Sequence, residues 1–300
     1  MAVYTNISID VLSLFIDNYE IGQLKNHNEI LEGVENTNYQ ITTTKKNYIL
    51  TIFEKRVKEN ELPFFIELQN HLFNKKIKCP QPIKDKKGQF INHIENKPCV
   101  IMSFLKGHKV QKPTYNHCLQ VGEHLANMHK HTKDYSLRRE NSLSQKFWRP
   151  IFEKCKKVPQ NTYSDLFETI EKELRFLETN WPINLPKGVI HADVFQDNVF
   201  FIDDILSGFI DFYFACNDFY AYELAVCLNA WCFEKDQSFN TTKASLILSG
   251  YQKKRRLNQD EMNSFPTLSR GAALRFLLTR LNDLIFHSSK DFVKPKDPQE

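Results

Sequence analysis

Two short apolar runs separated by an acidic turn constrain the fold of this chain more than any other feature of its sequence. The runs cover residues 199–202 and 207–210, and Asp203 and Asp204 stand between them. Apolar runs on both sides of a polar turn are typical of an antiparallel β-hairpin. The sequence therefore predicts a hairpin centred on Asp204 and Ile205, with a polar residue next to each of its outer ends.

Those two polar residues are Asn198, before the first run, and Asp211, after the second. In the predicted register they lie side by side, because opposed Cα atoms in an antiparallel ladder are about 4.5–5.5 Å apart. Amide and carboxylate oxygens are ligands that Mg²⁺ accepts together with phosphate oxygens and water. Asp193 lies on the incoming segment, where its carboxylate can take a proton from a substrate hydroxyl. The pattern predicts a phosphoryl-transfer centre with Asp193 as catalytic base and Asn198 and Asp211 as metal ligands.

The predicted secondary structure changes from mainly β to mainly helical near residues 105–107. Short β-like runs precede this point and long helical patterns follow it. We expect an α+β chain with a β-rich nucleotide-binding lobe at residues 1–105 and a mainly helical catalytic and substrate-binding lobe at residues 106–300. Strands are predicted at residues 29–33, 39–43, 48–53, 90–94 and 99–104, with a polar turn at residues 33–38. Helices are predicted at residues 7–19, 61–73, 114–131, 163–180, 220–233, 241–253 and 269–286.

The composition narrows the cellular setting. The 40 basic and 36 acidic residues leave a mild net charge of +4, from which we expect no nucleic-acid groove. Seven cysteines without a CxxC pair, and an N-terminus without a signal peptide, indicate a reducing cytoplasm. No stretch reaches the roughly 18 apolar residues that span a bilayer. The sequence predicts a cytoplasmic protein that binds neither nucleic acid nor membrane, and it leaves the oligomeric state open.

The predicted centre resembles a known catalytic core. The pattern His-x-Asp-x-x-x-x-Asn from His191 to Asn198, followed by a hairpin and Ile210-Asp211-Phe212, is similar to that of the aminoglycoside phosphotransferase and choline kinase-like superfamily. By this resemblance Asp193 matches the catalytic Asp, and Asn198 and Asp211 match the metal-binding pair. The resemblance implies a bilobal protein-kinase-like fold and a reaction that uses ATP and Mg²⁺.

Motifs across almost the whole chain resemble one branch of that superfamily, the homoserine kinases of this fold. The matching segments are residues 33–39, 62–65, 79–82, 148–150, 210–216, 228–233, 270–276 and 294–298. The resemblance implies ATP-dependent O-phosphorylation of L-homoserine to O-phospho-L-homoserine, a step of threonine biosynthesis. The chain would then be a small-molecule kinase, a transferase whose acceptor is an alcohol group.

The nucleotide site departs from the superfamily pattern. Thr51 stands where a Lys normally contacts the phosphates, and Phe65 stands where a Glu normally holds that Lys. Lys55 lies on the same face if the strand continues, so it is the candidate replacement. Ala192 replaces the Gly that usually precedes the catalytic Asp. The full set of candidate nucleotide-binding residues is Gly33, Asn36, Asn38, Lys55, Met102 and Phe104.

An amino-acid substrate needs a partner for its carboxylate and another for its ammonium group. Arg270 falls inside the apolar stripe of the predicted helix at residues 269–286, so it is the candidate carboxylate partner. Asp218 is the candidate ammonium partner, with capping of the next helix as its structural alternative. Tyr213 and Trp231 are candidate pocket walls because they lie near the catalytic segment. Asp193 completes this set by orienting the substrate hydroxyl.

Two other interpretations remain open on the sequence alone. The acceptor can be another hydroxyl compound, such as choline, ethanolamine, methylthioribose or an aminoglycoside. The altered positions Thr51 and Phe65 also permit a pseudokinase that binds nucleotide without transferring phosphate, although the complete Asp193, Asn198 and Asp211 set favours catalysis.

Overall fold

The computed structural model describes residues 4–31, 36–54, 57–157, 163–286 and 296–298. The chain divides into two compact units. The first contains Met1–His108 and Ser207–Tyr213, and the second contains Lys109–Leu206 and Phe214–Glu300. The sequence placed residues 207–213 with the second unit, and the structure assigns them to the first.

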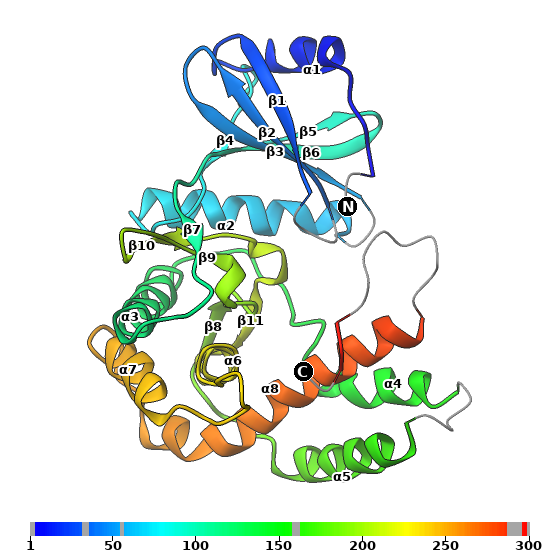
Figure 1. Ribbon diagram of the computed structural model, residues 1–300, viewed down its shortest axis with the longest axis vertical. Helices are drawn as coiled ribbons and strands as arrows, with labels where there is room; N and C mark the ends of the chain where they lie inside the picture. Colours follow the sequence, from blue (N-terminus) through cyan, green and yellow to red (C-terminus); the bar gives the residue numbers. More distant parts are fainter. Residues whose placement is uncertain (1–3, 32–35, 55–56, 158–162, 287–295, 299–300) are drawn as a thin grey trace. The chain divides into compact units, whose positions relative to one another are not determined.

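A six-stranded antiparallel sheet forms the first unit (Figure 1). Its strand order is β1-β2-β3-β6-β4, and β5 pairs with β6. The strands are β1 Leu24–Ile30, β2 Asn36–Thr43, β3 Asn47–Phe53, β4 Pro82–Ile83, β5 Ile91–Ile94 and β6 Lys97–Ser103. The helices of this unit are α1 Ile9–Ile16, the short 3-10 turn η1 Glu59–Glu61 and α2 Leu62–Asn74.

Alternation along β6 divides this core into two layers. Cys99 and Ile101 pack with the buried face of α1, whereas Val100 and Met102 pack with the buried face of α2. Successive side chains of a strand point to opposite faces of the sheet, so each face presents its own apolar set. The sheet is therefore covered on both faces, and the end of β6 carries Met102, one of the predicted nucleotide-binding residues.

The second unit is mainly helical. Its helices are α3 Tyr115–His131, α4 Gln145–Cys155, α5 Ser164–Asn180, α6 Tyr220–Trp231, α7 Thr241–Gln252 and α8 Gln259–Ile285. Its short elements are β7 His108–Lys109, β8 Lys187–Ile190, η2 Gln196–Asn198, β9 Val199–Ile202, β10 Ile205–Phe209, η3 Phe212–Phe214 and β11 Cys216–Phe219, some of which run into the first unit.

Helix α6 is the central element of the second unit. Almost all of its side chains are buried. It packs on α8 and on the antiparallel pair β8–β11, and Figure 1 shows it between these elements. A helix with mostly apolar side chains on all sides belongs in a core rather than at a surface. Through this packing, α6 supports the loop that follows β8.

Several predicted elements are confirmed and others are wrong. The helix at residues 114–131 is confirmed as α3, with Thr114 as its N-cap. The predicted turn at residues 33–38 is wrong at its end, because β2 already begins at Asn36. The hairpin turn consists of Asp203 and Asp204, both at positive φ, so the predicted centre at Asp204 and Ile205 is wrong and the register derived from it does not follow.

Helices α3 and α7 lie side by side with their backbones very close (Figure 1). A Cβ atom added at Gly250 of α7 would lie 2.1 Å from the carbonyl oxygen of Leu119 in α3. A Cβ atom added at Gly122 of α3 would lie 2.0 Å from the carbonyl oxygen of Ile247. Both clashes are with rigid backbone, so this helix pair requires glycine at both positions.

We expect Gly250→Ala to lower the free energy of unfolding by about 1–3 kcal/mol, the usual cost of overpacking a well-filled core. Urea denaturation followed by circular dichroism measures the change. Ser249→Ala, at an exposed neighbouring position of α7, is the matched control and should leave the midpoint nearly unchanged. Equal midpoints for the two variants would contradict the close packing of α3 and α7.

Among the residues that the structure describes, no helix combines the length and the apolar character needed to cross a membrane.

Candidate active site

The loop that follows β8 brings Asp193 and Asn198 together, as their spacing predicts. The Asn198 side-chain nitrogen donates to the backbone carbonyl and to Oδ2 of Asp193, at 2.9 Å each. The turn η2 carries Asn198 back toward Asp193 and into β9. Asp193 stays partly accessible to solvent. The loop thus presents a carboxylate whose position is fixed by an amide five residues later.

These contacts also set the direction of the Asn198 amide. Because its nitrogen is used by Asp193, its Oδ1 points away from that carboxylate, and no hydrogen bond engages Oδ1 within the described part of the chain. An amide oxygen in this position fits a hard cation such as Mg²⁺. Asp211 is exposed and has φ of 60°, an unusual backbone conformation for a residue other than glycine. Since it belongs to the first unit, its closeness to Asn198 stays a prediction.

Burial dominates the electrostatics of Asp193. Loss of hydration raises the pKa of its carboxyl group above the ordinary aspartate value. The positive charge of Arg275 opposes this rise, as do His191 and the hydrogen bond from Asn198, whereas Asp197 adds to it. A carboxylate with a raised pKa is a stronger base than an ordinary aspartate, which suits the acceptance of a proton from a hydroxyl group.

A buried carboxylate on α6 holds the same loop from below. Glu223 is fully buried, and it accepts the backbone N–H of His191 at 2.7 Å and of Ala192 at 2.6 Å. His129 of α3 also lies 2.9 Å from Glu223, through Nε2. Ala192 has φ of 64°, which explains why glycine is usual at this place. The two hydrogen bonds from the peptide groups stabilise a backbone shape that alanine disfavours.

The tautomer of His129 follows from its two contacts. Burial lowers the pKa of His129, so the ring is neutral, with one N–H donor and one acceptor. Nε2 faces the Glu223 carboxylate and therefore donates, whereas Nδ1 accepts from the Tyr251 hydroxyl at 2.8 Å. Helices α3, α6 and α7 are thus linked to the loop of Asp193 by one chain of hydrogen bonds. Neither His129 nor Glu223 is among the site residues that the sequence predicts.

Two predicted pocket walls lie in packed surroundings. Trp231 is fully buried, and its indole N–H donates to the carbonyl oxygen of Val194 at 2.8 Å, so it supports the loop of Asp193 from within the core. The ring of Tyr213 packs edge-on against Phe53 and Phe65 of the first unit, with centroid distances of 5.0 and 5.9 Å. The predicted contact of either residue with substrate stays a prediction without support from this geometry.

The two predicted substrate charges have different surroundings. Both oxygens of Asp218 accept hydrogen bonds, from Asn141 Nδ2 at 2.6 Å and from the Phe219 N–H at 2.8 Å, and burial raises its pKa. Arg270 is more exposed, makes two hydrogen bonds of 2.9 Å to Glu173 and lies 3.5 Å above the Phe176 ring. Its charge is already neutralised at the surface, so the geometry does not support Arg270 as the carboxylate partner.

The predicted nucleotide-binding residues are distributed over the first unit. Asn36 and Asn38 belong to β2, and Asn38 Oδ1 accepts the Thr51 hydroxyl at 2.8 Å. Met102 is buried in β6, whereas Phe104 follows the strand with 37% of its surface exposed. Gly33 and Lys55 lie outside the described residues. Their predicted contacts with nucleotide stay predictions.

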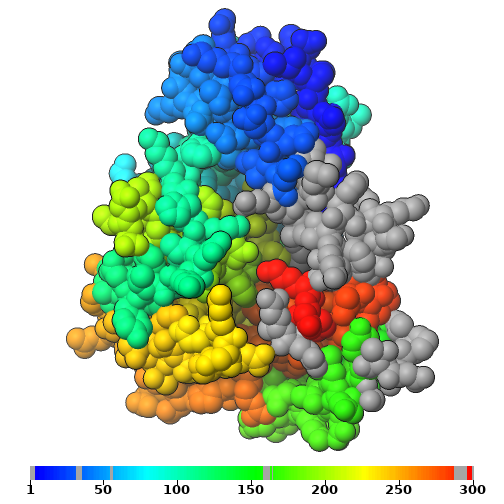
Figure 2. All heavy atoms as spheres, in the orientation of Figure 1, coloured from blue at the N-terminus to red at the C-terminus, as the bar shows by residue number. Residues whose placement is uncertain are grey.

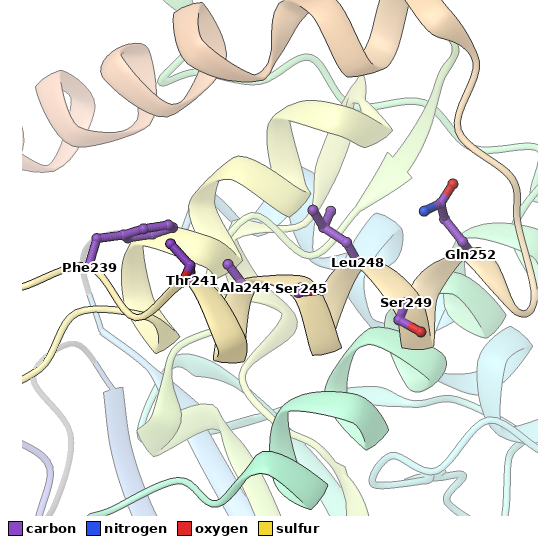
Figure 3. Close-up of a pocket in the computed structure, with 7 residues that line it drawn as sticks. All are labelled: Phe239, Thr241, Ala244, Ser245, Leu248, Ser249 and Gln252. Carbon is purple, nitrogen blue, oxygen red and sulfur yellow. The ribbon is translucent and has the colours of Figure 1, made fainter.

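One hollow on the second unit lies away from these residues. It has a volume of about 510 Å³ and runs along α7, lined by Phe239, Thr241, Ala244, Ser245, Leu248, Ser249 and Gln252 (Figure 3). None of these residues is a predicted site residue. The segment that precedes α7, yellow in Figure 2, lies at the surface. Its Phe233 and Phe239 side chains are exposed.

The chain is similar to proteins of a known family over most of its length. Residues 27–257 match the model of a family described as the phosphotransferase enzyme family. Homoserine kinases from Parvibaculum lavamentivorans and Rhizobium meliloti are 50% and 48% identical to the chain over 300 residues. These alignments cover 100% of this chain and 94% and 92% of the respective relatives.

Solved structures show the same fold at low identity. A spectinomycin phosphotransferase solved with ADP and spectinomycin has a TM-score of 0.75 at 14% identity, covering 96% of this chain and 92% of that chain. An amicoumacin kinase in complex with AMP-PNP and Ca²⁺ has a TM-score of 0.74 at 15% identity, covering 96% and 89%. These likenesses confirm the predicted α+β, protein-kinase-like fold.

Proposed function

This chain belongs to the phosphotransferase enzyme family and, within it, to the homoserine kinases, and we propose that it transfers the γ-phosphoryl group of ATP to the hydroxyl group of L-homoserine. The observation that carries the proposal is the identity of 50% over the full chain to a homoserine kinase. The joined Asp193 and Asn198 side chains support it, because they are the parts that such a transfer requires.

In the proposed reaction, the substrate hydroxyl oxygen attacks the γ-phosphorus, the bond between that phosphorus and the ADP oxygen breaks, and the hydroxyl proton passes to Asp193. Asn198 holds the Asp193 carboxylate in place while this occurs. Asn198 Oδ1 and Asp211 would hold Mg²⁺, which supplies charge neutralisation for the β- and γ-phosphates when bound. The product is O-phospho-L-homoserine, an intermediate of threonine biosynthesis.

We propose that the first unit binds ATP. Adenine would lie at the end of β6, near Met102 and Phe104, and the phosphates would be bound by Asn36 and Asn38 together with Gly33 and Lys55. The exposed ring of Phe104 supports this placement, because it offers an apolar surface to a base. Seven free and buried cysteines support a reducing compartment, and we propose the cytoplasm.

A coupled assay of ADP release tests the proposal. The enzyme with Mg-ATP is offered L-homoserine, L-serine, L-threonine, choline, ethanolamine, methylthioribose and kanamycin in separate reactions. We expect turnover on L-homoserine to exceed that on every other compound. Turnover on another compound alone would show that the chain is a kinase with a different acceptor substrate. Silence on all seven with Mg-ATP still bound would favour a pseudokinase.

The activity should depend on pH through Asp193. Only the ionised carboxylate accepts a proton, and burial raises its pKa above the ordinary aspartate value of 3.8. We therefore expect kcat/KM for L-homoserine to rise as the pH increases through that raised pKa, so the acid limb lies above pH 3.8. Initial rates across an acid-to-neutral range measure it, with stability checked at each pH. A rate that is constant down to pH 4 would contradict the role of Asp193.

Removal of the second metal ligand should affect nucleotide binding. We expect Asp211→Ala to weaken the binding of Mg-ATP by about tenfold or more, because one charged ligand of the metal is lost. Titration calorimetry with Mg-ATP and with metal-free ATP measures the two affinities. The difference between them should shrink in the variant. Unchanged affinity for Mg-ATP would contradict the assignment of Asp211 to the metal.

A further inference from the structure

Arg275 of α8 is a buried cation that pairs with no carboxylate among the described residues. Only 2% of its surface is exposed. Its Nη1 donates to the carbonyl oxygen of Ala192 at 2.7 Å. Its Nε has no hydrogen-bond partner in the described part of the chain, and no carboxylate there forms a direct ion pair with its guanidinium. The guanidinium carbon lies 4.5 Å from the ring centre of Phe276.

A buried charge in this condition is costly. Charged side chains are rarely buried without a counterion, because burial removes the water that hydrates the charge. Two carboxylates are close enough for Arg275 to lower their pKa values, namely those of Asp193 and Asp218. Each of them is hydrogen-bonded elsewhere, Asp193 to Asn198 and Asp218 to Asn141. The guanidinium Nε therefore remains an unused donor, beside the Ala192 carbonyl that precedes the proposed base and within electrostatic reach of the proposed ammonium partner.

We propose that Arg275 binds the α-carboxylate of the amino-acid substrate. This inference rests on the proposed function and deepens it, because it assigns to Arg275 the role that the sequence suggested for Arg270. A planar guanidinium matches a carboxylate with two parallel hydrogen bonds, and the low-polarity surroundings of Phe276 strengthen the attraction. L-Homoserine would present its hydroxyl to Asp193, its ammonium to Asp218 and its carboxylate to Arg275.

The arrangement predicts a preference for α-amino acids over amino alcohols. The compound 3-aminopropan-1-ol has the hydroxyl and the ammonium of homoserine and lacks only the carboxylate. A charge-assisted hydrogen bond contributes about 1.5–3 kcal/mol, so the wild-type enzyme should prefer L-homoserine by roughly 10- to 100-fold in kcat/KM. Arg275 is the residue on which this preference should depend.

The test compares both substrates in the wild type, Arg275→Met and Arg275→Lys. We expect Arg275→Met to lose about 10- to 100-fold more in kcat/KM on L-homoserine than on 3-aminopropan-1-ol, because only homoserine carries the carboxylate. A loss common to both substrates measures the support that Arg275 gives to the Ala192 carbonyl. Arg275→Lys keeps the positive charge but lacks the planar guanidinium. Its preference for L-homoserine should lie between those of the wild type and Arg275→Met. Arg270→Met, which removes an arginine from the same helix at the surface, is the control and should retain the wild-type preference.

Thermal unfolding with added ligand tests the same contact when a variant turns over too slowly for kinetics or has a less stable fold. In thermal unfolding, L-homoserine should raise the Tm of the wild type and of Arg270→Met but not that of Arg275→Met, whereas Mg-ATP should raise the Tm of all three. An equal loss on both substrates, or a retained Tm shift with homoserine in Arg275→Met, would overturn the inference and leave Arg275 as a positioning residue for the Ala192 carbonyl. Wild-type inactivity on homoserine would instead overturn the proposed function.

Discussion

We expect Asp193→Asn to lower kcat on L-homoserine by about 10²- to 10⁴-fold, the usual contribution of a positioned general base. The amide has the same shape as the carboxylate but cannot accept the hydroxyl proton. Because Asp193 is not a metal ligand in this account, the KM for Mg-ATP should change by only a few-fold. Steady-state kinetics with both substrates varied measure the two effects. Asp197→Asn, at an exposed neighbouring position, is the control and should keep most of the activity.

The same substitution should make the fold more stable at neutral pH. Burial raises the pKa of Asp193 in the folded chain above its unfolded value, so the folded state binds this proton more tightly. The stabilisation is fully present below the ordinary aspartate pKa and is lost as the pH rises through the folded pKa. At pH 7 the buried charge therefore costs stability, and the neutral amide removes that cost.

The activity of the same variant decides the assignment of the base. An Asp193→Asn enzyme that keeps the wild-type kcat on L-homoserine would refute it.

We expect Glu223→Ala to give the largest loss of stability. The carboxylate accepts two backbone N–H groups and the ring N–H of His129, all of them buried. Each buried donor left without an acceptor costs about 1–3 kcal/mol, so the free energy of unfolding should fall by several kcal/mol. Activity should fall with it at temperatures where the variant is folded, because the peptide group of Ala192 loses its support.

Urea denaturation measures this loss, with Glu123→Gln as the control. Glu123 pairs with Lys253 at the surface, where an ion pair contributes about 0–1 kcal/mol. Glu223→Gln keeps the shape of the side chain and removes its charge. Its amide nitrogen cannot accept a hydrogen bond, so at least one of the three donors stays unsatisfied. A Glu223→Ala variant as stable as the control would show that the hydrogen bonds to the catalytic loop contribute little.

The sequence predicts most elements because their signals are local. The helix α3 has an apolar stripe and a Thr114 cap, and α2 begins with a proline in its first turn, where proline is tolerated. Helix α4 was missed because Pro150 lies within it, and α8 begins before the predicted residue 269, with Pro266 in its interior. An interior proline normally ends a helix, so in both places tertiary packing overrides the local signal.

The contacts of the candidate site also differ in how well the sequence predicts them. Asp193 and Asn198 are near in sequence, and a single turn brings them together, so their spacing was sufficient. Glu223 and Arg275 act on His191 and Ala192 across 32 and 83 residues, and no local pattern predicts such contacts. Arg275 was passed over because helical spacing puts it on the flank of the apolar stripe, whereas the fold buries that flank as well. A charged residue between Leu274 and Leu278 was the available signal.

The identity of the reaction product tests the central proposal most directly. The wild-type enzyme is incubated with Mg-ATP and L-homoserine, and phosphorus–proton correlation NMR is recorded on the mixture. We predict a new phosphate ester signal coupled to the C4 methylene protons of homoserine, appearing together with ADP and absent in Asp193→Asn. Formation of ADP and inorganic phosphate without a phosphate ester would contradict the proposal that this chain is a homoserine kinase.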